Sequence, residues 1–168
     1  LYSEAARLVF ADRNQYVADG EFVSVQVRGM LDKGYLAERG RLIGETSMGV
    51  AQPGTPPLAL ARGQDATPEL PSTSHVSIVD GDGMAVSMTS SIEDGFGSRL
   101  MVNGYLLNNQ LTDFSFTSLD AAGLPVANRV EPGKRPRSSM SPLLVFDKPS
   151  GELTMTLGSP GGSAIINY

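Results

Sequence analysis

The residue best placed to act as a nucleophile is Thr73. The chain contains no cysteine and a single histidine, His75, which excludes thiolate chemistry and a zinc site built from several histidines. An amino-terminal threonine needs neither, because its own α-amino group serves as the base. That chemistry requires the chain to be cut immediately before the threonine. An exposed segment must precede the cut, and a strand must follow it. The sequence around Thr73 fits this pattern; the alternative is that Thr73 simply begins a strand, where threonine is common.

A second hydroxyl is expected beside Thr73. If residues 81–83 form a three-residue hairpin loop, the strand pairing places Ser91 opposite Thr73, whereas a two-residue loop places Ser90 there. Either hydroxyl could hold the freed amine or the threonine oxygen. The alternative is an ordinary pair of hydroxyl residues across two strands.

Three further segments carry polar groups in patterns suited to a site. The glycine-rich turn at 158–163 follows an expected strand, and consecutive backbone N–H groups there could stabilise an oxyanion, hold a phosphate or simply form a tight turn. The polar run at 108–113 follows two leucines, so its amides and carboxylate either line a site or cap a turn. Hydroxyls at 138–141 precede another expected strand and leave the same choice open.

The elements that would position these groups change in type along the chain. Apolar spacing predicts a helix over residues 2–18 capped by Ser3 and a weaker helix over 28–44 with Asp32 as a cap. Five prolines between 49 and 72 indicate a flexible, exposed linker. From Thr73 onward, alternation and turn residues predict a hairpin of strands 75–80 and 85–92, a short strand at 105–108, and a hairpin of strands 143–146 and 153–157. The expected fold class is therefore α+β.

Composition limits the classes of function. The 168 residues suffice for one ordinary domain, with 40% hydrophobic and 18% charged residues. The net charge of −5 argues against a nucleic-acid partner, and no apolar run is long enough to span a bilayer. No signal peptide is visible, and we expect both ends of the sequence to be fragment boundaries.

Taken together and in order, five motifs resemble the γ-glutamyltransferase (γ-glutamyltranspeptidase) family of N-terminal-nucleophile hydrolases. They lie at residues 73–80, 96–98, 107–110 with 113–115, 132–136 with 138–142, and 158–162. The resemblance implies a precursor that cuts itself between Ser72 and Thr73. It also implies that this chain is part of a four-layer αββα sandwich, in which residues 1–48 are the last part of the large-subunit region, 49–72 the linker and 73–168 the first part of the small-subunit region.

The resemblance also assigns roles to individual residues. Thr73 matches the nucleophile, and Ser91 matches the hydroxyl beside its amine. Gly161 and Gly162 match the oxyanion-hole pair. The substrate-binding positions are Gln110 and Asp113 for the α-amino group, Ser138 and Ser139 for the α-carboxylate, and Glu93, which stands where well-studied members have asparagine. If the return strand continued to residue 93, Glu93 would share the face of Ser91. His75 is expected to be a structural strand residue.

The implied activity is cleavage of γ-glutamyl amides such as glutathione, with water or an amino acid as the acceptor and no cofactor or metal. Two alternatives remain: an acylase of the same family that acts on glutaryl-type or cephalosporin amides, and a catalytically inert fragment or relative. The expected partners are the substrate and the two subunits of one precursor. The compartment would be periplasmic or secreted if the protein follows bacterial members of the family.

Overall fold

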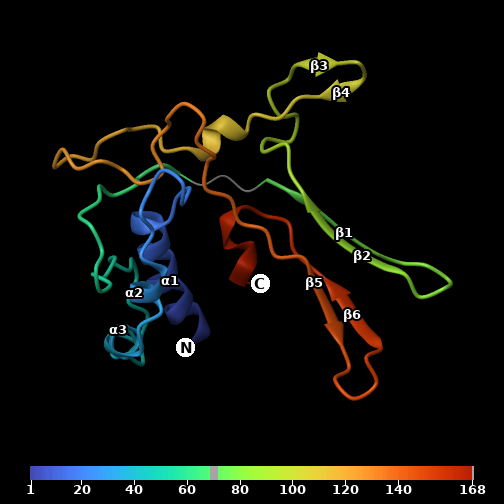
Figure 1. The fold of residues 1–168 in the computed structure, drawn as a ribbon, viewed down its shortest axis with the longest axis horizontal. Coiled ribbons are helices and arrows are strands. Elements are labelled where there is room, and N and C mark those ends of the chain that lie inside the picture. Colours follow the sequence, from blue (N-terminus) through green and yellow to red (C-terminus); the bar gives the residue numbers. More distant parts are fainter. Residues whose placement is uncertain (69–71, 168) are drawn as a thin grey trace. The chain divides into compact units, whose positions relative to one another are not determined.

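The computed structural model describes residues 1–68 and 72–167, and the chain divides into two compact units (Figure 1). Unit 1 is formed by Leu1–Thr67 and Phe114–Arg137, and unit 2 by Pro68–Asp113 and Ser138–Tyr168. The α-helices lie in unit 1 and the strands in unit 2, which confirms the predicted α+β class. No helix among these residues is long and apolar enough to cross a membrane.

Unit 1 begins with a helix whose cap differs from the prediction. Helix α1 spans Tyr2–Tyr16, its N-cap is Leu1, and no side chain caps it, so the prediction that Ser3 caps this helix is wrong. Asp32 does cap a helix, since its carboxylate accepts a hydrogen bond of 2.9 Å from the backbone N–H of Tyr35. The predicted helix over 28–44 is therefore interrupted, and the helices on either side of the break are α2 (Val27–Met30) and α3 (Lys33–Gly40).

Asp12 is the polar centre of unit 1. Its carboxylate accepts hydrogen bonds from the Tyr35 hydroxyl at 2.6 Å, from Arg39 at 3.1 Å and from the Gly54 backbone N–H at 2.7 Å. Burial, together with the Asp12 carboxylate, raises the pKa of Tyr35. These bonds fasten α1 to α3. The buried apolar residues of unit 1 are Leu8, Val23, Tyr35, Phe114, Val126 and Ala127.

The first part of the predicted linker is attached to unit 1. Residues 49–67 contain no helix or strand, but the Tyr16 hydroxyl donates to the Gly54 carbonyl at 2.7 Å and Pro56 is fully buried. The Gly63 N–H donates to the Pro125 carbonyl at 2.9 Å. Residues 69–71 of the predicted linker lie outside the described residues.

The first hairpin of unit 2 has the register expected for a three-residue loop. Strands β1 (Ser74–Val79) and β2 (Ala85–Ser90) pair antiparallel, with Ser74 opposite Ser90. The Asp80 N–H donates to the Met84 carbonyl at 3.0 Å, which closes the loop. Extending this register by one residue places Thr73 opposite Ser91.

The other strands of unit 2 also form hairpins rather than one continuous sheet. The predicted pair at 143–146 and 153–157 is confirmed as β5 (Leu143–Phe146) and β6 (Leu153–Leu157). The predicted strand at 105–108 is shorter: β4 (Tyr105–Leu106) pairs with β3 (Met101–Val102). The Ser87 hydroxyl of β2 donates to the Leu157 carbonyl of β6 at 2.9 Å, so two of the hairpins meet. Two 3-10 turns, η1 (Gln110–Asp113) and η2 (Ser163–Asn167), complete the unit.

Candidate active site

Thr73 lies directly before β1 in a backbone conformation that threonine rarely adopts. Its φ is 127°, and its β-branched side chain makes a positive φ especially unfavourable. Strain of this kind persists only where surrounding contacts enforce it, and it is concentrated at functional sites. The strained residue is the one whose preceding peptide bond is predicted to be cut.

The glycine-rich turn provides one of those enforcing contacts. The Gly162 N–H donates a hydrogen bond of 3.1 Å to the Ser72 carbonyl, which is the carbonyl of the Ser72–Thr73 peptide bond. Gly161 and Gly162 have φ values of 123° and 79°, and only glycine adopts such values readily. A predicted oxyanion donor therefore contacts the carbonyl that self-cleavage would attack.

The hydrogen bonds of Ser91 orient its hydroxyl. Its oxygen accepts from the Glu93 backbone N–H at 2.9 Å and from the Gln110 amide nitrogen at 3.4 Å. A serine hydroxyl has two acceptor lone pairs and one proton, so the proton remains for donation to a third group. The pairing of β1 with β2 ends at Ser74 opposite Ser90, and continuing it by one residue would bring Thr73 opposite this hydroxyl.

Glu93 belongs to a turn and not to a strand. Strand β2 ends at Ser90, so the expectation based on strand alternation is wrong at residue 93. Glu93 has a φ of 71°, and the residue is 7% exposed. Its carboxylate accepts a hydrogen bond from the Asn109 amide.

Asn109 is a residue that the sequence analysis did not assign to the site. Besides its bond to Glu93, its N–H donates to the Ile92 carbonyl at 3.2 Å and its side-chain oxygen accepts from the Asp94 N–H at 3.0 Å. Asn109 thereby fastens the turn after β2 to the segment that begins η1. The sequence feature that could have indicated this role is the position of Asn109 next to Gln110 in a polar run.

The remaining predicted site residues also lie in unit 2. Asp113 ends η1 and is half-buried. Ser138 is exposed and Ser139 half-buried, both before β5. The contacts described above form two groups: one joins Gly162 to the Ser72–Thr73 junction, and the other joins Ser91 to Glu93 and Gln110. Asp113, Ser138 and Ser139 belong to neither group.

His75 is engaged by its own hairpin. Its Nδ1 lies 2.9 Å from the Thr89 hydroxyl, and its Nε2 lies 3.0 Å from the Ser77 hydroxyl. The imidazole also packs against Gly158, where an added Cβ would be 2.1 Å from the ring. These contacts give His75 a structural role at the base of the glycine-rich turn.

Gly158→Ala is expected to destabilise the full-length protein by about 1–3 kcal/mol, because the new methyl group must displace the His75 ring. Chemical unfolding measures the change. Gly95→Ala is the matched control, since a Cβ there meets nothing within 4 Å. Equal stability of the two variants would show that the His75–Gly158 contact is not tightly packed.

Comparison with known proteins extends over the whole chain. The family model for gamma-glutamyltranspeptidase matches residues 1–168. A glutathione hydrolase proenzyme from Pseudomonas sp. (strain A14) is 39% identical over 176 residues, covering 97% of this chain and 28% of that protein. Its counterpart from Bacillus subtilis (strain 168) is 37% identical over 180 residues, covering 99% of this chain and 29% of that protein. The chain thus spans less than a third of the length of these curated relatives.

A solved structure gives a similar result. The crystal structure of cephalosporin acylase from Bacillus halodurans matches with a TM-score of 0.56 and 32% identity, over 80% of this chain and 21% of that one. Because the family model matches every residue from 1 to 168, the chain belongs to the γ-glutamyltranspeptidase family.

Proposed function

We propose that the full-length protein cuts itself between Ser72 and Thr73, and that the new amino-terminal Thr73 then cleaves γ-glutamyl amides such as glutathione. The observation that carries this proposal is the Gly162 N–H bound to the Ser72 carbonyl at 3.1 Å, next to a threonine with a φ of 127°. The curated relatives are named as proenzymes of glutathione hydrolase, which supports both steps.

In the first step, the Thr73 hydroxyl oxygen attacks the Ser72 carbonyl carbon. A C–O bond forms and the C–N bond breaks, while the hydroxyl proton is transferred to the departing nitrogen, so that an ester and a free Thr73 amine result. The Gly162 N–H stabilises the negative oxygen of the intermediate. Water then hydrolyses the ester, leaving a carboxylate on Ser72 and a hydroxyl on Thr73.

In the second step, the same hydroxyl attacks the γ-amide carbonyl of the substrate. The Thr73 amine accepts the hydroxyl proton and passes it to the leaving amine of the substrate, which leaves an acyl-enzyme ester. The acyl group of this ester is then transferred to water or to an acceptor amino acid. Gly161 and Gly162 N–H groups stabilise the oxyanion, and the Ser91 hydroxyl donates to the Thr73 oxygen or amine. We assign the substrate's α-amino group to Asp113 and the Gln110 amide oxygen, and its α-carboxylate to Ser138 and Ser139.

We further propose that residues 1–72 end the large subunit, that residues 73–168 begin the small one, and that the hairpins are part of a four-layer αββα sandwich. The exposed apolar side chains of the hairpins support this, because such residues need covering layers. They include Val76 and Ile78 of β1, Val86 and Met88 of β2, and Phe146 of β5.

An acylase of the same family is the second candidate. The likeness to a structure described as a cephalosporin acylase favours it. The carboxylate of the acyl group is common to γ-glutamyl and glutaryl amides, so contacts of Glu93 with that carboxylate would not distinguish the two substrates. A glutaryl amide lacks the α-amino group, so it would not require Asp113.

A paired-substrate assay separates the two candidates. The processed full-length protein should cleave a γ-glutamyl anilide with a higher kcat/KM than the matched glutaryl anilide, and the reverse order would establish the acylase. Glu93→Asn is expected to lower the γ-glutamyl to glutaryl ratio about ten-fold, because both substrates carry the carboxylate but only the γ-glutamyl substrate carries an ammonium group that a Glu93 carboxylate attracts. Two opposite charges about 12 Å apart interact by roughly 1.4 kcal/mol at an effective dielectric constant near 20, which is a factor of ten. Asparagine also tolerates the positive φ at this position. An unchanged ratio would remove Glu93 from the set of specificity residues.

A further inference from the structure

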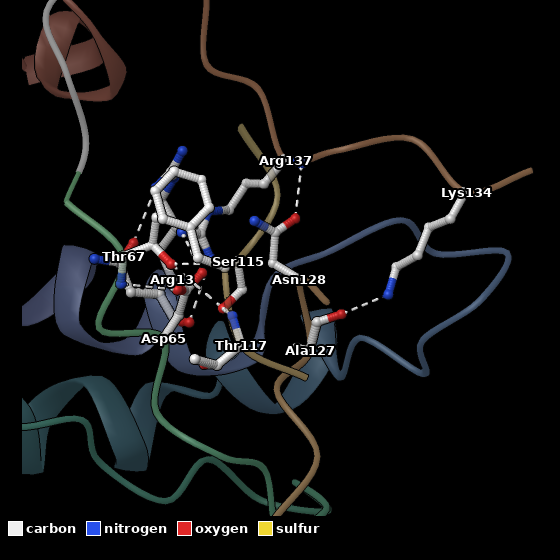
Figure 2. A network of polar contacts seen from close by, with 11 residues as sticks. Arg13, Asp65, Thr67, Ser115, Thr117, Ala127, Asn128, Lys134 and Arg137 are labelled. Atoms are coloured by element: carbon white, nitrogen blue, oxygen red, sulfur yellow. Dashed lines mark hydrogen bonds and ion pairs between the residues drawn. The ribbon is translucent and has the colours of Figure 1, made fainter. Parts of the chain in front are cut away.

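A buried ion pair joins two segments of unit 1 that are far apart in the sequence. Arg137 donates to the Asp65 carboxylate at 3.3 Å, and their side chains are 7% and 2% exposed. The Arg137 guanidinium also donates to the Asn14 carbonyl at 3.3 Å. Figure 2 shows this arginine next to Asn128, whose side-chain oxygen accepts the Arg137 backbone N–H at 2.9 Å.

The residues on either side of Asp65 are held by the same partner segment. Gly63 forms a parallel bridge with Val126. The Thr67 hydroxyl accepts from the Phe116 N–H at 3.0 Å and lies 3.4 Å from the Ser115 hydroxyl (Figure 2). Residues 63–67 are thus attached to residues 114–137 by backbone bonds as well as by the ion pair.

These contacts cross the proposed cut, which lies seven residues after Asp65. Cleavage between Ser72 and Thr73 would put Asp65 on the upstream product and Arg137 on the downstream product. We propose that the Asp65–Arg137 ion pair is the anchor that holds the end of the upstream chain on the downstream chain after cleavage. This inference rests on the proposed self-cleavage for its biological role.

Burial of both side chains distinguishes this pair from the ionic contacts that Arg135 makes across the cut. The Arg135 guanidinium binds Asp19 at 3.1 Å and lies 3.9 Å from Glu21; the Asp19 side chain is 1% exposed, but the Arg135 side chain is 74% exposed. Water reaches the charge of Arg135 in these contacts and screens it, which weakens them relative to a pair whose two side chains are both buried. Removing one partner of a buried pair leaves an uncompensated charge without water, which is strongly unfavourable, whereas an apolar pair of similar volume is tolerated.

The test measures retention of the upstream chain after a controlled cut. In full-length protein carrying Thr73→Ala, residues 68–72 are replaced by a site-specific protease sequence, the protein is cut, and the upstream chain retained on a tag at the downstream end is quantified. Arg137→Met should weaken retention about 100-fold or more. Arg129→Met is the matched control, because Arg129 pairs with Glu131 at 3.3 Å within the downstream product.

The double variant Asp65→Leu with Arg137→Met decides the case even if the single variant folds poorly. It removes both charges, so its retention should be close to that of the parent. Retention in Arg137→Met equal to the parent, or loss in the double variant as large as in the single one, would overturn the proposal. Since an added protease makes the cut, these outcomes do not depend on self-cleavage, whose failure would appear separately as an uncut protein with Thr73 intact.

Discussion

Thr73→Ala is expected to leave the full-length protein as one uncut chain, while the parent yields two. The expectation follows from the strained φ of 127° at Thr73 and the hydrogen bond of 3.1 Å that the adjoining Ser72 carbonyl accepts from Gly162. Alanine removes the attacking oxygen, but the carbonyl keeps its hydrogen-bond donor. Because the nucleophile is the group that forms the new bond, we expect no detectable cleavage of Thr73→Ala even after days of incubation.

Ser72→Ala is the control for this experiment. It removes the other hydroxyl at the junction but leaves the carbonyl that Gly162 contacts, so cleavage should still occur before residue 73. Mass spectrometry of both products identifies the new termini. Cleavage of Thr73→Ala at the same bond would show that Thr73 does not drive processing. Loss of cleavage in Ser72→Ala but not in Thr73→Ala would show that the Ser72 hydroxyl, and not that of Thr73, is the nucleophile.

Local sequence patterns predict the structure correctly where the conformation depends on residues that are close together in the chain. The hairpin register follows from a three-residue loop, so the pairing of Ser74 with Ser90 could be derived by counting. The sequence predicts the Asp32 cap correctly because the Asp32 carboxylate accepts a hydrogen bond from a backbone N–H only three residues ahead. The Ser3 cap was wrong because α1 begins at Tyr2, one residue before it, and ends of helices are weakly specified by sequence.

Patterns failed where a long-range contact decides the conformation. Glu93 follows the strand, but its bond to Asn109, sixteen residues later in the chain, accompanies a turn with a left-handed backbone. The hydrogen bond between Gly162 and Ser72 joins residues separated by most of unit 2, and no periodicity in the sequence encodes it. The motif at 158–162 indicated an anion-binding turn but not which carbonyl occupies it.

Replacing Gly162 by glycolic acid, which substitutes an ester for the backbone amide, is expected to slow self-cleavage about 10²–10³-fold. The ester lacks the N–H that contacts the Ser72 carbonyl but keeps the conformational freedom that a φ of 79° requires. Loss of one oxyanion donor has a cost of this size in other acyl-transfer enzymes. The rate is followed as the disappearance of the uncut chain after refolding or release from a denaturant.

Glycolic acid at Gly151 is the matched control, because Gly151 has a φ of 74° and its N–H donates a bond of 2.8 Å to the Asp147 carbonyl in the β5–β6 turn. This replacement removes a comparable hydrogen bond and should cost about 1 kcal/mol of stability, with the cleavage rate unchanged. The comparison separates loss of a turn bond from loss of an oxyanion donor. If both esters slow cleavage equally, the Gly162 contact only supports the fold, and the negative charge that develops on the Ser72 oxygen must be stabilised by another donor.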